Sequence, residues 1–133
     1  MQAAKVEGGW GIQYNRAMSL QKQIALIGAG NMTEALIAGM LKAEIANSGQ
    51  IFATDILPDR LARLQSLHKV RIGRNNREAS AWGQVVILSI EPQILDDVLL
   101  EISQSINPSH LIISVAAGYP IARVAAHLGQ GLR

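Results

Sequence analysis

The segment Gly28-Ala29-Gly30-Asn31-Met32 has the residue types of a turn that binds a phosphate group. Gly28 permits a tight turn, and Gly30 lacks the Cβ atom that would keep a diphosphate away from the main chain. Backbone amides at the start of a following helix, around Asn31 and Met32, direct partial positive charge toward such an anion. The pattern therefore predicts binding of a dinucleotide. The alternative is a glycine turn that binds nothing.

Thr33 departs from the usual glycine-rich pattern, which has a third glycine at this place. We expect the Thr33 hydroxyl to bond the backbone instead. Asn31 is expected to cap the helix, with Glu34 three residues later in the spacing of a capping box.

Asp55 ends the second apolar run, Ile51-Phe52-Ala53-Thr54. A carboxylate at this place accepts hydrogen bonds from the adenosine ribose hydroxyls of a dinucleotide and repels a 2′-phosphate, which favours NADH. Arg60 lies near enough in sequence to weaken that repulsion. Asp55 is also well placed to cap the next helix. The preference between NADP and NAD is therefore left open.

Two segments that follow later apolar runs are predicted to join the same site. Ser89-Ile90-Glu91-Pro92 leaves the fourth run, and Ser114-Val115-Ala116-Ala117-Gly118 leaves the fifth. In an open parallel sheet, ligands lie beyond the carboxyl ends of the strands, where the winding reverses. Small residues there suit the close approach of a flat nicotinamide ring, and tight packing under a helix is the alternative reason for them.

The remaining residues predict no catalytic side chain and no metal site. The chain has no cysteine, and its three histidines lie far apart without acidic residues at ligand spacing. It contains neither a Gly-x-Ser-x-Gly elbow nor a Gly-Lys-Ser/Thr phosphate loop. Arg71, Arg74 and Arg77 form a small basic cluster. We interpret it first as solvated surface and second as a group that reaches a nucleotide phosphate.

The elements that must position these residues follow from an alternation of five short apolar runs with helical patterns. This order predicts parallel crossovers and helix layers on both faces of the sheet. We expect an α/β fold, a doubly wound Rossmann-type parallel sheet of about five strands. Pro58 and Pro92 are expected to open two of the helices. The apolar faces of these two helices are predicted to contain Leu57, Leu61, Leu64 and Leu67 in the first and Ile94, Leu95, Val98, Leu99 and Ile102 in the second.

Length and composition fit one domain. The chain has 133 residues, of which 49% are hydrophobic and 17% charged, and this supplies a core. Residues 1–20 show no periodic pattern and are expected to be a poorly structured extension before a dinucleotide-binding domain over residues 21–133. A formal net charge of +2, spread along the chain, predicts no nucleic-acid partner. No apolar run suits a membrane span and no signal peptide opens the chain, so a cytoplasmic location is expected.

Residues 22 to 133 resemble pyrroline-5-carboxylate reductase, the last enzyme of proline synthesis. The resemblance rests on four segments in the same order: residues 27–39, Asn76-Arg77-Glu78, Pro92-Gln93 and residues 114–118. It implies an oxidoreductase that transfers a hydride from NAD(P)H to the C=N bond of 1-pyrroline-5-carboxylate, giving L-proline.

The resemblance also implies roles for individual residues. The turn from Gly28 to Met32 would hold the diphosphate, and Thr54 with Asp55 would face the adenosine ribose. Asn76 would contact the nucleotide. Residues from Ser89 to Pro92 and from Val115 to Ala117 would line the nicotinamide side.

Two departures from the family pattern stand out. The family usually has Lys-Pro where this chain has Glu91-Pro92, and a carboxylate pointing inward there would weaken binding of an anionic cofactor. The sequence stops at Arg133, before the family's Arg-Val-Met-Pro-Asn segment and its helical C-terminal domain. That domain dimerises and builds the substrate pocket in the family. We therefore expect the cofactor half of a homo-oligomeric enzyme, inactive by itself.

Two other functions remain open. One is a stand-alone NAD(P)-binding or sensing domain. The other is a related small NAD(P)-dependent oxidoreductase, such as a coenzyme F420-linked reductase.

Overall fold

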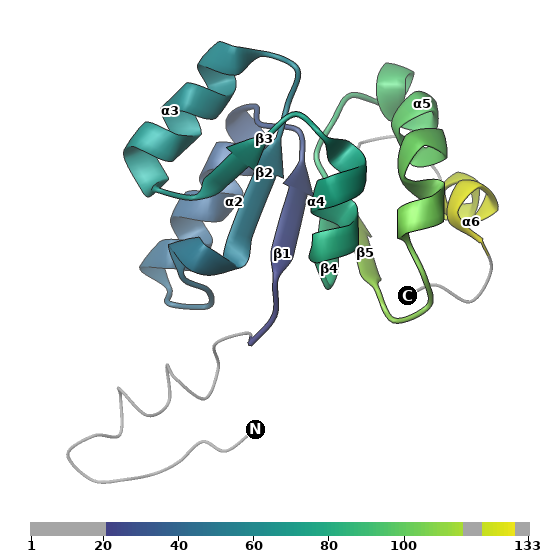
Figure 1. Ribbon diagram of the computed structural model, residues 1–133, viewed down its shortest axis with the longest axis horizontal. Helices are drawn as coiled ribbons and strands as arrows, with labels where there is room; N and C mark the ends of the chain where they lie inside the picture. The colour runs from purple at the N-terminus through teal and green to yellow at the C-terminus, as the bar shows by residue number, and fades with distance from the viewer. Residues whose placement is uncertain (1–20, 116–120, 130–133) are drawn as a thin grey trace, which may run out of the picture.

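The computed structural model describes residues 21–115 and 121–129. In this part of the chain, five strands form one parallel sheet in the order β3-β2-β1-β4-β5. Helices cover both faces of the sheet (Figure 1). The predicted doubly wound Rossmann-type fold is confirmed. The extension predicted for residues 1–20 lies outside the described residues.

The strands are apolar because helices cover both faces of the sheet. Every residue is buried in the three central strands, β1, β2 and β4, whereas the edge strand β5 has alternating exposed and half-buried residues. The strands are β1 (Ile24–Ile27), β2 (Ile51–Thr54), β3 (Arg71–Gly73), β4 (Val85–Leu88) and β5 (Leu111–Ser114).

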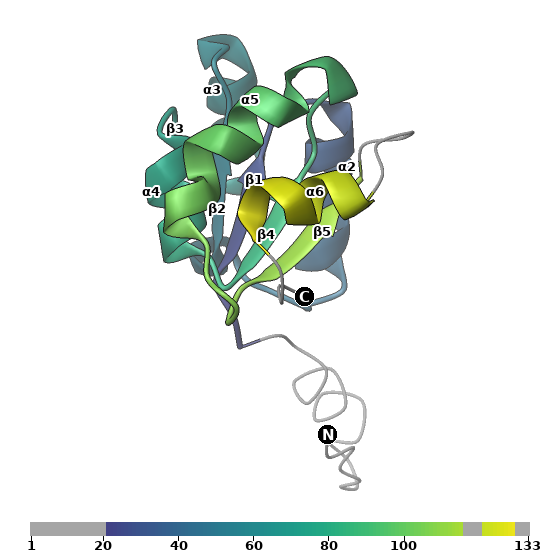
Figure 2. The same ribbon diagram turned by 90° about the vertical axis from the view of Figure 1, so that its right-hand side faces the viewer.

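The helices form two layers (Figures 1 and 2). One layer contains α2 (Asn31–Lys42) and α3 (Pro58–His68). The other contains α4 (Asn76–Trp82), α5 (Pro92–Ile102) and α6 (Ile121–Leu128). Short 3-10 turns, η1 (Ser48–Gln50) and η2 (Ser103–Ser105), precede β2 and follow α5.

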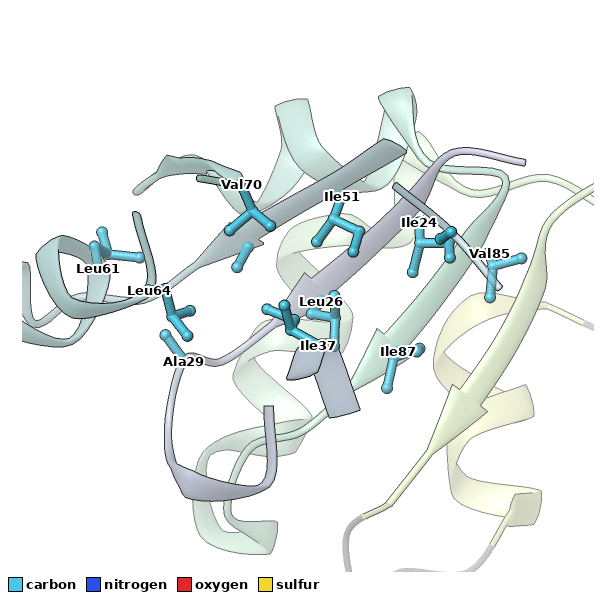
Figure 3. Close-up of a cluster of buried hydrophobic side chains, with 12 residues drawn as sticks. Ile24, Leu26, Ala29, Ile37, Ile51, Leu61, Leu64, Val70, Val85 and Ile87 are labelled. Carbon is cyan, nitrogen blue, oxygen red and sulfur yellow. The ribbon is translucent and has the colours of Figure 1, made fainter. Parts of the chain in front are cut away.

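The sheet contributes side chains to the apolar clusters under both helix layers, because successive side chains of a strand point to opposite faces. In β1, Ile24 and Leu26 belong to the cluster under α2 and α3, whereas Ala25 and Ile27 belong to the cluster on the other face. Figure 3 shows Ile37 of α2 lying against Leu26.

The helical periodicity predicts more buried residues on α3 and α5 than the structure contains. Leu61 and Leu64 are buried as predicted, but Leu57 and Leu67 are 45% and 53% exposed. Ile94 is exposed as well. Leu57 is the N-cap of α3 rather than part of its buried face. Leu57 and Ile94 both line the pocket described below, which explains why neither is packed into the core.

The start of α2 also differs from the prediction. The helix begins at Asn31, so its N-cap is Gly30, and no side chain caps it. The Glu34 carboxylate accepts hydrogen bonds from the Arg63 guanidinium of α3 at 2.8 and 3.0 Å. These bonds lower the pKa of Glu34, which stays ionised and paired instead of completing a capping box. The N-terminus of α2 is consequently left without a cap from a side chain.

Candidate dinucleotide-binding site

A pocket of about 550 Å³ lies at the carboxyl ends of β1, β2 and β4. The winding of the sheet reverses between β1 and β4, which is where open α/β sheets bind ligands. All predicted site residues that the structure describes line this pocket, namely Gly28, Ala29, Gly30, Asn31, Met32, Thr54, Asp55, Asn76, Ser89, Ile90, Glu91, Pro92 and Val115. Ala116 and Ala117, with Gly118, lie outside the described residues.

Gly28 is required by the fold itself. Its φ of +108° lies in a region that glycine adopts readily and that residues with a side chain rarely adopt. A Cβ atom at this position would stand 2.3 Å from the carbonyl oxygen of Ser89, which is far inside van der Waals contact. The Gly28 amide donates to the Thr54 carbonyl at 2.8 Å. The turn is thus held tightly between the ends of β2 and β4.

Thr33 completes the turn from the helix side. Its hydroxyl donates to the Gly28 carbonyl oxygen at 2.6 Å, and its side chain is fully buried. The expected bond from the Thr33 hydroxyl to the backbone is therefore confirmed. It ties the first turn of α2 to the end of β1, the close approach that a third glycine usually provides.

Gly30 has a different environment from Gly28. Its φ of −83° and ψ of −163° are extended backbone that any residue adopts. A Cβ atom added at Gly30 would have Nη1 of Arg60 as its nearest neighbour at 3.7 Å, an ordinary contact with the end of a flexible side chain. The fold does not require glycine here. The bare main chain at the N-terminus of α2 instead leaves room for a ligand in the pocket.

Asp55 lies at the end of β2, with its side chain 8% exposed. Its Oδ2 accepts from the Ala29 amide and its Oδ1 from the Leu57 amide, both at 2.8 Å. Since the N-cap of α3 is Leu57, Asp55 is not the cap of that helix. The carboxylate joins the glycine turn to the loop after β2 and lines the pocket between them.

Asn76, at the start of α4, is held from two sides. The Thr54 hydroxyl donates to Asn76 Oδ1 at 2.5 Å, and Asn76 Nδ2 donates to a carboxylate oxygen of Glu101 at 2.9 Å. Thr54 is fully buried, so its hydroxyl serves this bond rather than a ligand directly. The sequence did not indicate Glu101, because Glu101 lies on another helix, 25 residues after Asn76.

Ser89 to Pro92 form the opposite wall of the pocket. The Ser89 amide donates to the Ile27 carbonyl at 2.9 Å, which continues the pairing of β4 with β1 beyond the strand ends. Glu91 is the N-cap residue of α5, and Pro92 is in its first turn. The Glu91 carboxylate is exposed and accepts from Gln93 Nε2 at 3.1 Å. A negative charge therefore stands at this wall.

Several further residues line the pocket, although the sequence analysis does not assign them to the site. Ile56, Leu57, Ile94 and Val98 add apolar surface, and Arg60 and Arg74 add two cations. Ile56 could have been found from the sequence, because it is an apolar residue in the loop directly after a strand. Helical spacing places Leu57, Ile94 and Val98 on apolar faces but does not distinguish a buried face from a pocket wall; Val98 packs against the core and lines the pocket as well.

Residues 23–118 match the family described as NADP oxidoreductase, coenzyme F420-dependent. The chain belongs to this family. Its described part is accordingly an NAD(P)-dependent oxidoreductase domain of the Rossmann type.

Within the NADP oxidoreductase family, the chain is similar to pyrroline-5-carboxylate reductases. It is 39% identical to that of Pseudomonas aeruginosa over 108 residues, which are 81% of this chain and 39% of the relative. The structure of a pyrroline-5-carboxylate reductase from Coxiella burnetii matches with a TM-score of 0.80 and 25% identity, over 86% of this chain and 42% of that one. The predicted resemblance to the N-terminal domain of these enzymes is confirmed.

A further solved structure shares the fold. The pyrroline carboxylate reductase of Plasmodium falciparum, with NADP bound, matches with a TM-score of 0.72 and 20% identity, over 84% of this chain and 40% of that one. The chain spans about two fifths of the length of these relatives.

Two negative findings apply to residues 21–115 and 121–129. No helix there is long and apolar enough to cross a membrane. No three His, Asp or Glu side chains in these ranges gather into a group that could hold a metal ion.

Proposed function

We propose that this chain is the cofactor-binding part of a pyrroline-5-carboxylate reductase. The full polypeptide would reduce 1-pyrroline-5-carboxylate to L-proline with NAD(P)H. The names of the curated relatives and the pocket at the winding reversal support this assignment. The nicotinamide of the cofactor supplies the hydride, and the protein supplies binding and orientation.

The observation that carries the proposal is the contrast between the two glycines of the turn. Gly28 is explained by the fold, because a Cβ there would overlap the Ser89 carbonyl. Gly30 has space for a Cβ on the protein side, and its own backbone conformation suits any residue. A diphosphate resting against bare main chain at the N-terminus of α2 accounts for glycine at this second position.

The remaining residues are assigned by their place around the pocket. Asn31 and Met32 contribute helix N-terminal amides to the diphosphate, and Ala29 lies in the same turn. Asp55 and Asn76 face the adenosine half, with Thr54 orienting Asn76.

The segments Ser89–Pro92 and Val115–Ala117 take the nicotinamide half. We assign the dinucleotide-binding domain to residues 21–133. The larger remainder of the relatives' length is proposed to provide the substrate pocket and the contact between subunits.

The test has two stages. The chain is titrated with NADPH and with NADH while cofactor fluorescence is recorded, and saturable binding at sub-millimolar concentrations is expected. The full polypeptide is then supplied with 1-pyrroline-5-carboxylate and NAD(P)H, and formation of proline is measured. Failure to bind either cofactor, or cofactor binding without proline formation, would contradict the assignment.

The family to which the chain belongs is described as coenzyme F420-dependent, and this favours one competing function. A coenzyme F420-linked reductase would exchange hydride between NADP and coenzyme F420 and would form no proline. Supplying the full polypeptide with NADPH and oxidised coenzyme F420 distinguishes the two functions, because F420 reduction would favour the competing one.

A further inference from the structure

Glu101 does not line the pocket, but its side chain contacts a residue that does. It is in the last turn of α5, which packs against α4 (Figure 1). Its carboxylate accepts a hydrogen bond from Nδ2 of Asn76 at 2.9 Å, and Asn76 lines the pocket at the start of α4. The carboxylate therefore lies one hydrogen bond away from any ligand that Asn76 contacts.

The Glu101 carboxylate fixes the direction of the Asn76 amide. A half-turn of an amide side chain exchanges its carbonyl oxygen and its NH2 group. A carboxylate only accepts hydrogen bonds, so the NH2 group must face Glu101. The carbonyl oxygen then faces the Thr54 hydroxyl, which donates to it at 2.5 Å. The hydroxyl alone would not select this direction, because it can both donate and accept.

The fixed direction determines what Asn76 offers to a ligand. Within the described residues its side chain makes these two bonds, which leaves one hydrogen on Nδ2 and one lone pair on Oδ1. The donor is on the side of α5 and the acceptor is on the side of β2. A reversed amide would exchange the donor and the acceptor at the pocket wall.

The backbone of residue 101 is held in place independently of the carboxylate. Nε of Arg77 donates to the backbone carbonyl of Glu101 at 3.1 Å, a bond that any residue at this position would accept. Leu99 and Ile102 are fully buried in the core on this face of the sheet. In the part of the chain that the structure describes, the bond to Asn76 is the one that the carboxylate makes. Changing this side chain should consequently leave the packing of α5 intact.

We propose that Glu101 is a positioning residue of the dinucleotide site, which holds the Asn76 amide in the direction that the adenosine half of the cofactor requires. A side chain that is already arranged for its ligand loses less freedom on binding and binds more tightly. A negative charge near a pocket for an anionic ligand would by itself weaken binding. Charge alone and positioning therefore predict opposite effects of removing the carboxylate. This inference rests on the proposed function, because it concerns cofactor binding in the same pocket.

The test measures Kd values for NADPH and NADH by fluorescence titration of the chain and its variants. Glu101→Ala frees the Asn76 amide, so the Kd for both cofactors should rise by about two- to tenfold, the effect of one neutral hydrogen bond. Glu101→Gln keeps the side-chain volume but can both donate and accept, so both directions of the amide become available. Equal population of the two directions would raise the Kd by about twofold.

Asp97→Asn is the matched control for charge. Asp97 is on the same helix, is exposed and does not line the pocket, and the variant removes one negative charge as Glu101→Gln does. It should leave both Kd values unchanged. Circular dichroism checks that each variant is folded, and Glu101→Gln decides the question should Glu101→Ala fail to fold.

A double-variant cycle tests whether Glu101 acts through Asn76. Asn76→Ala should raise the Kd at least as much as Glu101→Ala does, and combining the two changes should raise it no further. A merely structural role of Glu101 would weaken binding by the same factor in both backgrounds.

NMR spectra of the chain without cofactor give a second measurement. The side-chain NH2 signals of Asn76 are identified by their loss in Asn76→Ala, and they should shift in Glu101→Gln. The backbone amide signals of Gly28 and Gly30 should stay in place, because the glycine turn makes no contact with Glu101.

The outcomes separate this inference from the proposed function. Unchanged or tighter binding in the Glu101 variants, an unchanged Kd in Asn76→Ala, a further loss in the double variant, or unshifted Asn76 signals in Glu101→Gln would overturn the positioning role. Binding of NADPH or NADH by the parent chain would keep the pocket a dinucleotide site in each of these cases. Binding of neither cofactor by the parent chain would overturn both proposals.

Discussion

Replacing Gly30 by alanine tests whether this glycine serves the ligand rather than the fold. The extended backbone of Gly30 accepts a side chain, and the nearest atom to the new Cβ is 3.7 Å away at the end of Arg60. Gly→Ala at such a compatible position changes stability by about 0.4–1 kcal/mol in the favourable direction, through the unfolded chain. The folded protein should therefore form normally.

Cofactor binding should change much more than stability. The new methyl group would stand where the diphosphate must approach the amides of α2. Loss of one charge-assisted hydrogen bond costs about 1.5–3 kcal/mol. Since about 1.4 kcal/mol corresponds to tenfold in affinity, the Kd for NADPH should rise by about ten- to hundredfold.

Two other glycines provide controls for the assay. Gly39, within α2, has no atom within 4 Å of an added Cβ and lies away from the pocket lining, so Gly39→Ala should stabilise the helix by up to about 1 kcal/mol with unchanged binding. Gly28→Ala should destabilise the fold by more than about 2 kcal/mol, because of the overlap with Ser89 and the positive φ. Urea unfolding and NADPH fluorescence titration measure the two quantities separately. A folded Gly30→Ala variant with the Kd of the parent chain would refute the reasoning.

Three further predictions concern stability and are measured by urea unfolding. Thr33→Val removes the buried hydroxyl bond to Gly28 and should cost about 1–2 kcal/mol, whereas Thr33→Ser retains the donor; equal losses in both variants would count against the bond. His110→Leu should lower the free energy of unfolding by about 2 kcal/mol or more, because Nδ1 of the buried imidazole accepts from the Asn107 amide and Nε2 lies 3.0 Å from the Ser80 carbonyl oxygen. An unchanged urea midpoint would contradict this. The pKa of Glu34 is lower in the folded chain, so its pair with Arg63 stabilises above the usual value of 4.5 and loses that contribution as the pH falls through the folded-state pKa. Arg63→Gln should therefore be less stable than the parent at about pH 7, and the difference should shrink as the pH falls below the usual value; a difference that does not change on acidification would exclude the ion pair as its cause.

The fold and the place of the pocket could be predicted from local pattern. Short apolar runs such as Val85–Leu88 alternate with helical segments, and this order leaves a parallel sheet with helices on both faces as the consistent arrangement. Glycines directly after the first run mark the turn at the winding reversal. Both signals depend on neighbours in the sequence, so no knowledge of distant contacts is needed.

The prediction failed where a side chain has a choice of partners. Asn31 and Glu34 have capping-box spacing, yet Glu34 pairs with Arg63, which is 29 residues away. Leu57 and Ile94 fit helical apolar faces but line the pocket instead. For Glu34, a contact made only after the chain folds competes with the local preference and prevails. For Leu57 and Ile94, the folded chain leaves a pocket rather than core beside the predicted apolar face.

Local sequence patterns were sufficient to predict a Rossmann-type domain with a glycine turn, because alternation and turn chemistry act between adjacent residues. Only the tertiary structure distinguished Gly28 from Gly30, since the Ser89 carbonyl that excludes a side chain at the first is brought there by the pairing of β4 with β1. The same holds for the arginines. Packing of α4 against the sheet and α5 engages Arg71 and Arg77 and leaves Arg74 at the pocket, because the direction of each side chain is set by the face on which its backbone lies.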